Sequence, residues 1–90
     1  MSDLAIDRPI KIAYIGGGSR HWARVMMQDL ALTPGVAGEV ALYDIDHARA
    51  QANVGMGEAI FAHADAVSSF RVSAPAERAE ALRGADVVFI

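Results

Sequence analysis

Residues 10–19 read Ile-Lys-Ile-Ala-Tyr-Ile-Gly-Gly-Gly-Ser, an apolar run that ends in three glycines and a serine. Its β-branched and aromatic residues favour a strand, and the residues from Arg20 onward have helical periodicity. A chain that leaves a parallel strand for a crossover helix has to turn sharply, and a residue without Cβ tolerates the positive φ that this turn requires. Gly16 suits that position. The stretch therefore predicts a strand, a glycine turn and a helix in succession.

The glycine run also has the spacing of a dinucleotide phosphate site. Two residues after the turn, at Gly18, the backbone of such a site approaches a pyrophosphate so closely that a side chain would collide with it. The first turn of the next helix presents unpaired N–H groups that hold an anion, and Ser19 adds a hydroxyl group there. Arg20 either reaches a phosphate or stays solvated. His21 replaces the third glycine of the fingerprint, which implies a more distant helix or an outward side chain, and a glycine turn without a ligand stays open as the alternative.

The next strand supplies an acid. Residues 39–44 read Glu-Val-Ala-Leu-Tyr-Asp, and a carboxylate at the end of this strand accepts both hydroxyl groups of the adenosine ribose. Asp44 lies 26 positions after Gly18, and the loop over residues 33–38 accounts for the surplus over the usual spacing of about 20. Asp46 competes for this role but better suits the N-cap of the following helix.

These features favour NAD as the ligand. A carboxylate at Asp44, with no adjacent arginine, repels the 2′-phosphate of NADP. We expect the cofactor to contact Gly16, Gly17, Gly18, Ser19, Arg20 and Asp44.

The rest of the chain alternates between helical and extended patterns. Pro75 suits the first turn of a third helix and Gly84 its C-terminal end. The alternation predicts an α/β fold, a Rossmann-type parallel sheet in the order 3-2-1-4 with helices on both faces. Helices are expected over residues 20–32, 47–63 and a short stretch between 75 and 84, and further strands over residues 69–73 and 85–90.

Two helix faces are expected to pack on the sheet. One consists of apolar residues at helical spacing, and the other is a stripe of small residues. Trp22 packs the first helix onto the sheet or, alternatively, borders the ligand pocket. Gly57, with Gly55, weakens the middle of the second helix, where a break is possible. The first face comprises Trp22, Val25, Met26 and Leu30, and the stripe comprises Ala48, Ala52, Gly55 and Ala59.

The composition limits the classes of function. With 53% hydrophobic and 21% charged residues, the chain is globular, and its 90 residues make one domain at most. A net charge of −3 argues against binding to nucleic acid or to a membrane surface. The chain has no cysteine, and its three histidines have no pairing that favours a metal site. Residues 1–9 carry acids and no long apolar core, so we expect neither a signal peptide nor a membrane span there. We therefore expect a cytoplasmic protein.

An apolar strand over residues 85–90 would need cover, because an exposed hydrophobic edge promotes aggregation. We therefore expect residues 1–90 to be the N-terminal portion of a dinucleotide-binding domain, with the catalytic and metal-binding remainder elsewhere in a longer protein.

Residues 10–19, together with Trp22-Ala23-Arg24 and Val-Ala-Leu-Tyr-Asp-Ile-Asp at residues 40–46, resemble glycoside hydrolase family 4, most closely its α-galacturonidase branch. The resemblance runs from about Ile10 to Ile90. It implies hydrolysis of α-galacturonides, or otherwise of α-glucosides or α-galactosides, through transient oxidation at C3 by NAD, removal of the C2 proton and elimination. It also implies a divalent metal, usually manganese, a small sugar as substrate, and a homo-oligomer as the full protein. The family's metal ligands and catalytic base belong to later segments, so no catalytic or metal residue is expected in this chain.

Two other functions stay open. An NAD-dependent 2-hydroxy acid dehydrogenase shares the strand, the glycine loop and the acid, but produces NADH, whereas the glycosidase recycles its NAD. A non-catalytic NAD-sensing module would change a partner contact instead of a reaction rate.

Overall fold

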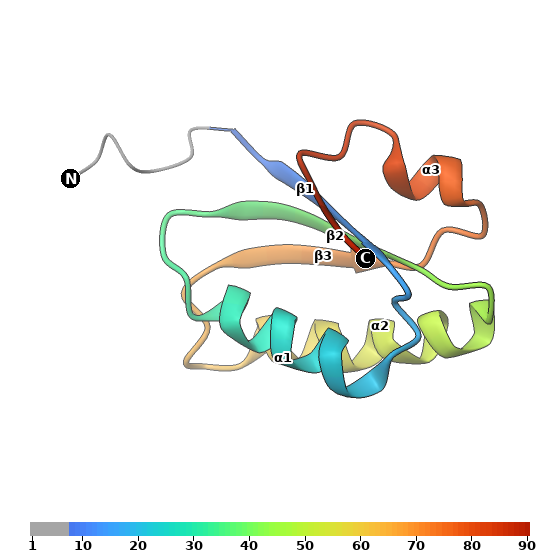
Figure 1. Cartoon of the computed structure of the whole chain (residues 1–90). Coiled ribbons are helices and arrows are strands. Elements are labelled where there is room, and N and C mark those ends of the chain that lie inside the picture. The colour runs from blue at the N-terminus through green and yellow to red at the C-terminus, as the bar shows by residue number, and fades with distance from the viewer. Residues whose placement is uncertain (1–7) are drawn as a thin grey trace.

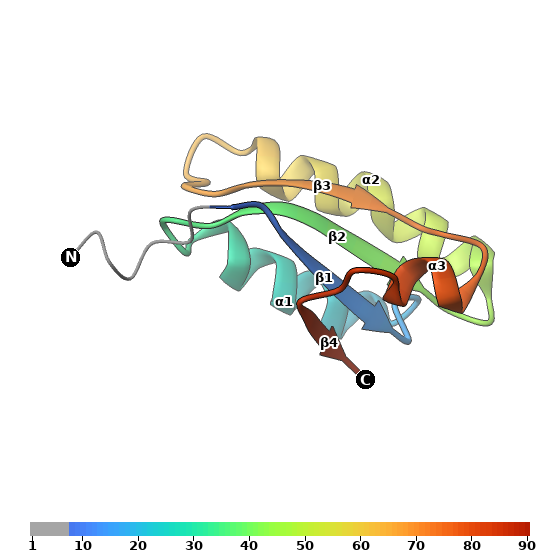
Figure 2. The same ribbon diagram turned by 90° about the horizontal axis from the view of Figure 1, so that it is seen from above.

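The computed structural model describes residues 8–90, which form a four-stranded parallel sheet with helices on both faces (Figure 1). α1 and α2 cover one face and α3 lies on the other, as the view from above also shows (Figure 2). The strand order β3-β2-β1-β4 confirms the predicted Rossmann-type sheet. The expectation of neither a signal peptide nor a membrane span concerns residues 1–9, of which residues 1–7 lie outside the described residues. In chain order the elements are β1 (Ile10–Ile15), α1 (Arg20–Ala31), β2 (Ala37–Tyr43), α2 (His47–Ala62), β3 (Ser69–Ser73), α3 (Arg78–Leu82) and β4 (Val87–Phe89).

The register of β1 and β2 positions the glycine turn. The two strands pair without interruption from Ile10 opposite Gly38 to Ile15 opposite Tyr43. Because the strands are parallel and end together, the residues that follow them emerge side by side. The glycine turn after β1 therefore lies beside Asp44, the residue that follows β2.

The core lies between the sheet and the helices α1 and α2. Met27 of α1 is fully buried at its centre. A Cβ atom on Gly57 of α2 would lie 2.7 Å from the sulfur of Met27 and 2.9 Å from Cγ2 of Val72, so this glycine allows the helices and β3 to meet. α2 consequently runs through its glycines without a break. The core cluster comprises Ile12, Ala23, Met27, Val40, Leu42, Ala50, Phe70 and Val72.

The predicted small-residue stripe of α2 is wrong. All four of its members, Ala48, Ala52, Gly55 and Ala59, are exposed. The buried face instead consists of Ala50, Asn53 and Gly57. The prediction selected the face by the small size of its residues. The face that is actually buried includes the polar Asn53, whose side chain is hydrogen bonded in the core.

Two predicted boundaries also differ from the structure. α3 begins at Arg78, after Glu77 as N-cap, so Pro75 precedes the helix rather than opening it. β4 begins at Val87 rather than at residue 85, because the side chain of Asp86 accepts a hydrogen bond from the backbone of Lys11 and its own N–H donates to the Lys11 carbonyl. The expected glycine at the end of α3 is confirmed, since Gly84 follows the C-cap with φ of 70°.

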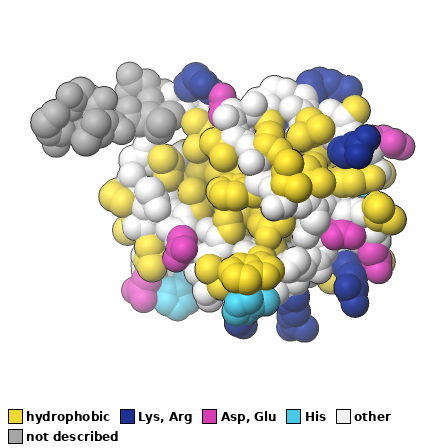
Figure 3. All heavy atoms as spheres, viewed as in Figure 1, with side chains coloured by type: hydrophobic (Ala, Val, Ile, Leu, Met, Phe, Trp, Pro, Cys, Tyr) yellow, Lys and Arg dark blue, Asp and Glu magenta, His cyan; other side chains and the backbone are white. Residues whose placement is uncertain are grey.

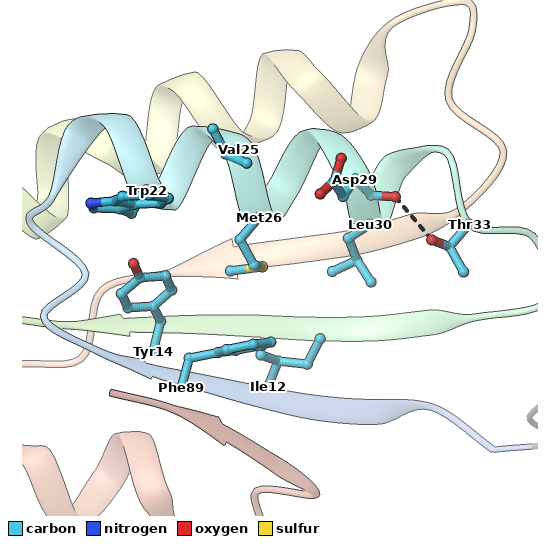
Figure 4. Close-up of a pocket in the computed structure, with 9 residues that line it drawn as sticks. All are labelled: Ile12, Tyr14, Trp22, Val25, Met26, Asp29, Leu30, Thr33 and Phe89. Atoms are coloured by element: carbon cyan, nitrogen blue, oxygen red, sulfur yellow. Dashed lines mark hydrogen bonds between the residues drawn. The ribbon is translucent and has the colours of Figure 1, made fainter.

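One face of α1 borders an open apolar groove between this helix and the strands β1 and β4, although Met26 and Leu30 of that face also pack against the core cluster. Figure 3 shows hydrophobic side chains gathered over the middle of this side of the molecule. In Figure 4, Tyr14 and Phe89 point from the strands toward Met26 and the rest of α1. Trp22 is 63% exposed, so the prediction that it packs α1 onto the sheet is wrong, and it lies at the groove instead. The groove is lined by Ile12, Tyr14, Trp22, Val25, Met26, Asp29, Leu30, Thr33 and Phe89.

Within residues 8–90, none of the helices combines the length and hydropathy needed to cross a membrane.

Candidate functional site

The glycine turn lies directly against the end of β2. Gly16 has φ of 94°, the left-handed conformation that the turn was expected to require. The N–H groups of Gly16 and Gly17 both donate to the carbonyl of Tyr43 at 2.8 Å. A Cβ atom on Gly17 would lie 2.7 Å from Cβ and 2.9 Å from Cα of Leu42, so only glycine fits here. Gly17 thus allows the turn to pack closely on β2, and His21, at the position of the third glycine of the fingerprint, is exposed.

Asp44 is held at the edge of this turn by two backbone groups. One carboxylate oxygen, Oδ2, accepts the N–H of Gly18 at 2.9 Å, and Oδ1 accepts the N–H of Asp46 at 2.9 Å. A Cβ atom on Gly18 would lie 2.8 Å from Oδ2 of Asp44 and 2.9 Å from Cβ of Arg49. Neighbours within the protein therefore favour glycine at position 18. Each carboxylate oxygen keeps a second lone pair for another donor.

The first turn of α1 opens beside the same turn. Ser19 is the N-cap, its N–H donates to the carbonyl of Gly16 at 3.0 Å, and its side chain makes no capping bond. The first helical hydrogen bond runs from the N–H of Ala23 to the carbonyl of Ser19. The N–H groups of residues 20–22 consequently have no partner within the helix, as at any helix N-terminus. Arg20 is exposed at this turn.

The start of α2 completes the surroundings of the turn. Asp46 caps this helix, its side chain accepting the N–H of Arg49 at 3.2 Å, which confirms the predicted N-cap. No arginine is adjacent to Asp44 in the sequence, but the first turn of α2 brings Arg49 against Gly18, a neighbour that sequence analysis did not name. Spacing along the sequence did not show this contact, since it depends on the direction in which α2 leaves the loop.

Sequence analysis also missed Asn53. This residue is 5% exposed, and its Nδ2 donates to the carbonyl of Gly17 at 2.8 Å. The signal was present in the sequence, because Asn53 follows Ala50 by three positions and precedes Gly57 by four, on one helix face. A polar residue in such a face indicates a specific hydrogen-bond partner.

Two hollows border the turn, one at Gly16 and the other at Gly18. The first is bounded by the ends of β1 and β2 and by α3, and the second by the first turns of α1 and α2. Among residues 8–90, no three His, Asp or Glu side chains are grouped as ligands for a metal ion. The first hollow is lined by Ile15, Gly16, Tyr43, Asp44, Ile45 and Arg78. The second is lined by Gly18, Ser19, Arg20, His21, Arg49, Ala52 and Asn53.

The chain is similar to a family of carbohydrate-active enzymes. Residues 11–90 match the family 4 glycosyl hydrolases. The sequence is 46% identical over 81 residues to the alpha-galacturonidase of Bacillus subtilis and 44% identical over 81 residues to that of Lachnoclostridium phytofermentans. Each alignment covers 90% of this chain but 17% of the relative, so the chain spans about a sixth of the length of these proteins.

A solved structure agrees with these matches. The crystal structure of a Bacillus subtilis protein named as a candidate glucosidase superposes with a TM-score of 0.77 at 42% sequence identity. The superposition covers 89% of this chain and 17% of that protein. The match along residues 11–90 and the shared sheet lead to one assignment: the chain belongs to family 4 of the glycosyl hydrolases.

Proposed function

We propose that this chain binds the adenosine half of NAD within a family 4 glycosidase. The observation that carries the proposal is the position of Asp44, whose carboxylate is fixed by two backbone N–H groups at the edge of the glycine turn. A carboxylate fixed in this way still accepts the two hydroxyl groups of a ribose through its remaining lone pairs. Charged acceptors make stronger hydrogen bonds than neutral ones.

The surroundings of Asp44 suit the other parts of the adenosine half. The N–H groups of residues 20–22 suit the pyrophosphate, since they are unpaired within the helix and lie at the positive end of its dipole. The N–H groups of Gly16 and Gly17 are used by β2, so their contribution is to shape the turn and not to donate to the phosphates. Ile45 is 94% exposed and lies with Arg78 at the first hollow, where an adenine ring would contact both side chains.

The role of the chain in turnover is to bind and orient the cofactor. Bound NAD supplies the acceptor for the hydride at C3 of the sugar. Residues 8–90 offer no grouped donors for a divalent metal. We therefore assign the metal ligands, the base and the sugar site to other parts of a longer protein. The names of the relatives favour α-galacturonides as the substrates, with α-glucosides as the second choice.

Calorimetric titration with NAD tests the binding role. Asp44→Ala should weaken NAD binding by about 1.5–3 kcal/mol, because it removes hydrogen bonds to a charged group. Asp65→Ala serves as the matched control, since Asp65 is an exposed carboxylate beyond the other end of α2. Equal affinities of the wild type and Asp44→Ala would refute the ribose assignment. Equal affinities for NAD and NADP would refute the preference for NAD.

A second experiment separates the glycosidase from the dehydrogenase. Turnover of an α-galacturonide by the longer protein in heavy water should place deuterium at C2 of the released sugar, because that proton is removed and replaced. A dehydrogenase would accumulate NADH and release no sugar. The present chain alone should be inactive on a chromogenic α-galacturonide, since it does not position the nicotinamide against the sugar.

A further inference from the structure

The peptide unit between Gly17 and Gly18 is held from both sides. Its carbonyl accepts a hydrogen bond from Nδ2 of Asn53 at 2.8 Å, and its N–H donates to Oδ2 of Asp44 at 2.9 Å. The C=O and N–H of a trans peptide point in opposite directions from one rigid plane. A side chain of α2 is therefore linked through a single peptide plane to the acid at the end of β2.

The geometry leaves this plane little freedom to rotate. The N–H of Gly17, at the preceding peptide, is already bonded to the carbonyl of Tyr43 at 2.8 Å. Asn53 is 5% exposed on the face of α2 that packs in the core. Burying an amide is unfavourable without a hydrogen bond, so the side chain of Asn53 has a strong preference for the Gly17 carbonyl.

We propose that Asn53 is a positioning residue for the cofactor acid. By fixing the Gly17–Gly18 peptide, Asn53 directs the Gly18 N–H toward Asp44 and keeps the carboxylate in the orientation that leaves its other lone pairs free for ribose hydroxyls. The effect on the cofactor passes through the peptide and Asp44. This inference rests on the proposed function for its consequence in NAD binding, whereas the hydrogen-bonded chain itself can be tested without any cofactor.

Ser68 offers a matched control at the opposite end of the sheet. It is the other buried polar residue of the described chain, at 9% exposed, and its hydroxyl donates to the carbonyl of Leu30 at 2.8 Å. Ser68 immediately precedes β3, whose first residue pairs with the first residue of β2. Removing its hydroxyl deletes the same kind of buried side-chain to backbone bond, far from the glycine turn.

The first measurement is amide hydrogen exchange at Gly18 in the chain without cofactor. Asn53→Leu should accelerate exchange of this amide by about fivefold to tenfold relative to the wild type, because its acceptor is no longer aligned. Ser68→Ala should leave it unchanged. If Asn53→Leu does not alter Gly18 exchange, or if Ser68→Ala alters it equally, the inference is wrong. Should circular dichroism show that Asn53→Leu is unfolded, Asn53→Asp replaces it, since it keeps the shape and lacks the N–H donor at neutral pH.

The second measurement is a double-mutant cycle on NAD affinity. Asn53→Leu should weaken binding by about fivefold to tenfold in the wild type and leave it unchanged in the Asp44→Ala background, since the effect passes through Asp44. An equal loss in both backgrounds would show that Asn53 acts without Asp44 and would overturn the inference. If no variant binds NAD at all, the proposed function fails, and the exchange of Gly18 still decides whether Asn53 fixes the peptide.

Discussion

The glycine turn at the carboxyl end of the sheet and the groove beside α1 differ in how much of each is paired or buried within the described residues. Around the turn, backbone and side-chain groups pair within the chain: Gly16 and Gly17 with Tyr43, and Gly18 with Asp44. The groove is apolar and open, and Trp22 at its edge is largely exposed. Both regions include α1, which contributes its first turn to one and the side that faces β1 and β4 to the other (Figures 1 and 4).

The difference shows that hydrogen bonding and hydrophobic burial depend on different parts of the structure. Hydrogen bonds at the turn join residues that neighbouring strands bring together, so they need only the elements from β1 to α2. Hydrophobic burial at the groove needs a second surface, and residues 8–90 contribute one wall of strands and one helix. The groups at the turn are therefore held by hydrogen bonds within the described residues, whereas the apolar side chains at the groove are only partly covered by them.

The largest expected effect comes from two adjacent methionines of α1. Met27 is fully buried and Met26 borders the groove. Met27→Ala should lower the free energy of unfolding by about 2–5 kcal/mol, because it leaves a cavity in the core. Met26→Ala should lower it by about 1 kcal/mol or less, because Met26 is only partly buried and borders the open groove. Urea unfolding of both variants measures the difference, and equal losses would show that the groove is as well packed as the core.

The second effect concerns the packing of the turn on β2. Gly17→Ala should destabilise the fold by about 1–3 kcal/mol, because the new methyl group would overlap Leu42, including its backbone. Gly55→Ala is the control, since a Cβ atom there meets nothing within 4 Å. That change should stabilise α2 by about 0.5–1 kcal/mol. If thermal unfolding shows the same shift for both variants, the close contact at Gly17 does not constrain the turn.

A smaller effect is expected at the outer strand of the groove. Val88 of β4 is 44% exposed on a strand that pairs with β1 on one side. Val88→Lys should weaken self-association of the chain by about tenfold, because a charged edge strand resists pairing with another chain. Ile45→Lys, at an exposed apolar residue outside the strands, should leave association unchanged. Sedimentation velocity over a range of concentrations distinguishes the two, and equal behaviour would assign association to general hydrophobicity.

The smallest effect is the pH dependence of the contact that holds the start of β4. A hydrogen bond from Arg8, together with one from the backbone N–H of Lys11, lowers the pKa of Asp86 below its ordinary value. A lowered pKa in the folded state stabilises the fold above the unfolded pKa of about 3.9, and this contribution is lost as the pH falls through the folded pKa. Asp86→Asn should therefore lower the urea midpoint slightly at pH 7, and by progressively less as the pH falls below the unfolded pKa and through the folded one. The difference should also shrink at high salt, because the pair is exposed, and a difference that is constant with pH would contradict the role of the charge.

The sequence predicted the sheet well because its signals are local. Each strand is a short apolar run, and alternation with helices permits few parallel topologies. The positive φ of Gly16 and the capping by Asp46 also follow from residue type and position. The family resemblance, drawn from the same residues, is confirmed by the match over residues 11–90.

The errors occurred where the answer depends on how helices are oriented. The buried face of α2 contains Asn53, whose spacing from Ala50 and Gly57 marks that face, but its partner, the Gly17 carbonyl, lies 36 positions away and depends on how α2 packs. Arg49 reaches Gly18 only because α2 starts close to the turn. Trp22 was expected to pack α1 onto the sheet or to border the ligand pocket, but it is 63% exposed at the edge of the groove. The assignment of the cofactor contacts remains a prediction.

The contact between Lys11 and α3 has a consequence for the order of folding. Nζ of Lys11 donates to the carbonyls of Glu80 at 3.0 Å and Arg83 at 2.8 Å, which are 69 and 72 positions away in the chain. A helix of five residues does not persist alone in water, because its nucleation is too unfavourable. The carbonyls of Glu80 and Arg83 gain this charged partner only when β1, near the other end of the sequence, lies beside them. We therefore expect α3 to acquire its structure late, after the long loop between the two segments has closed.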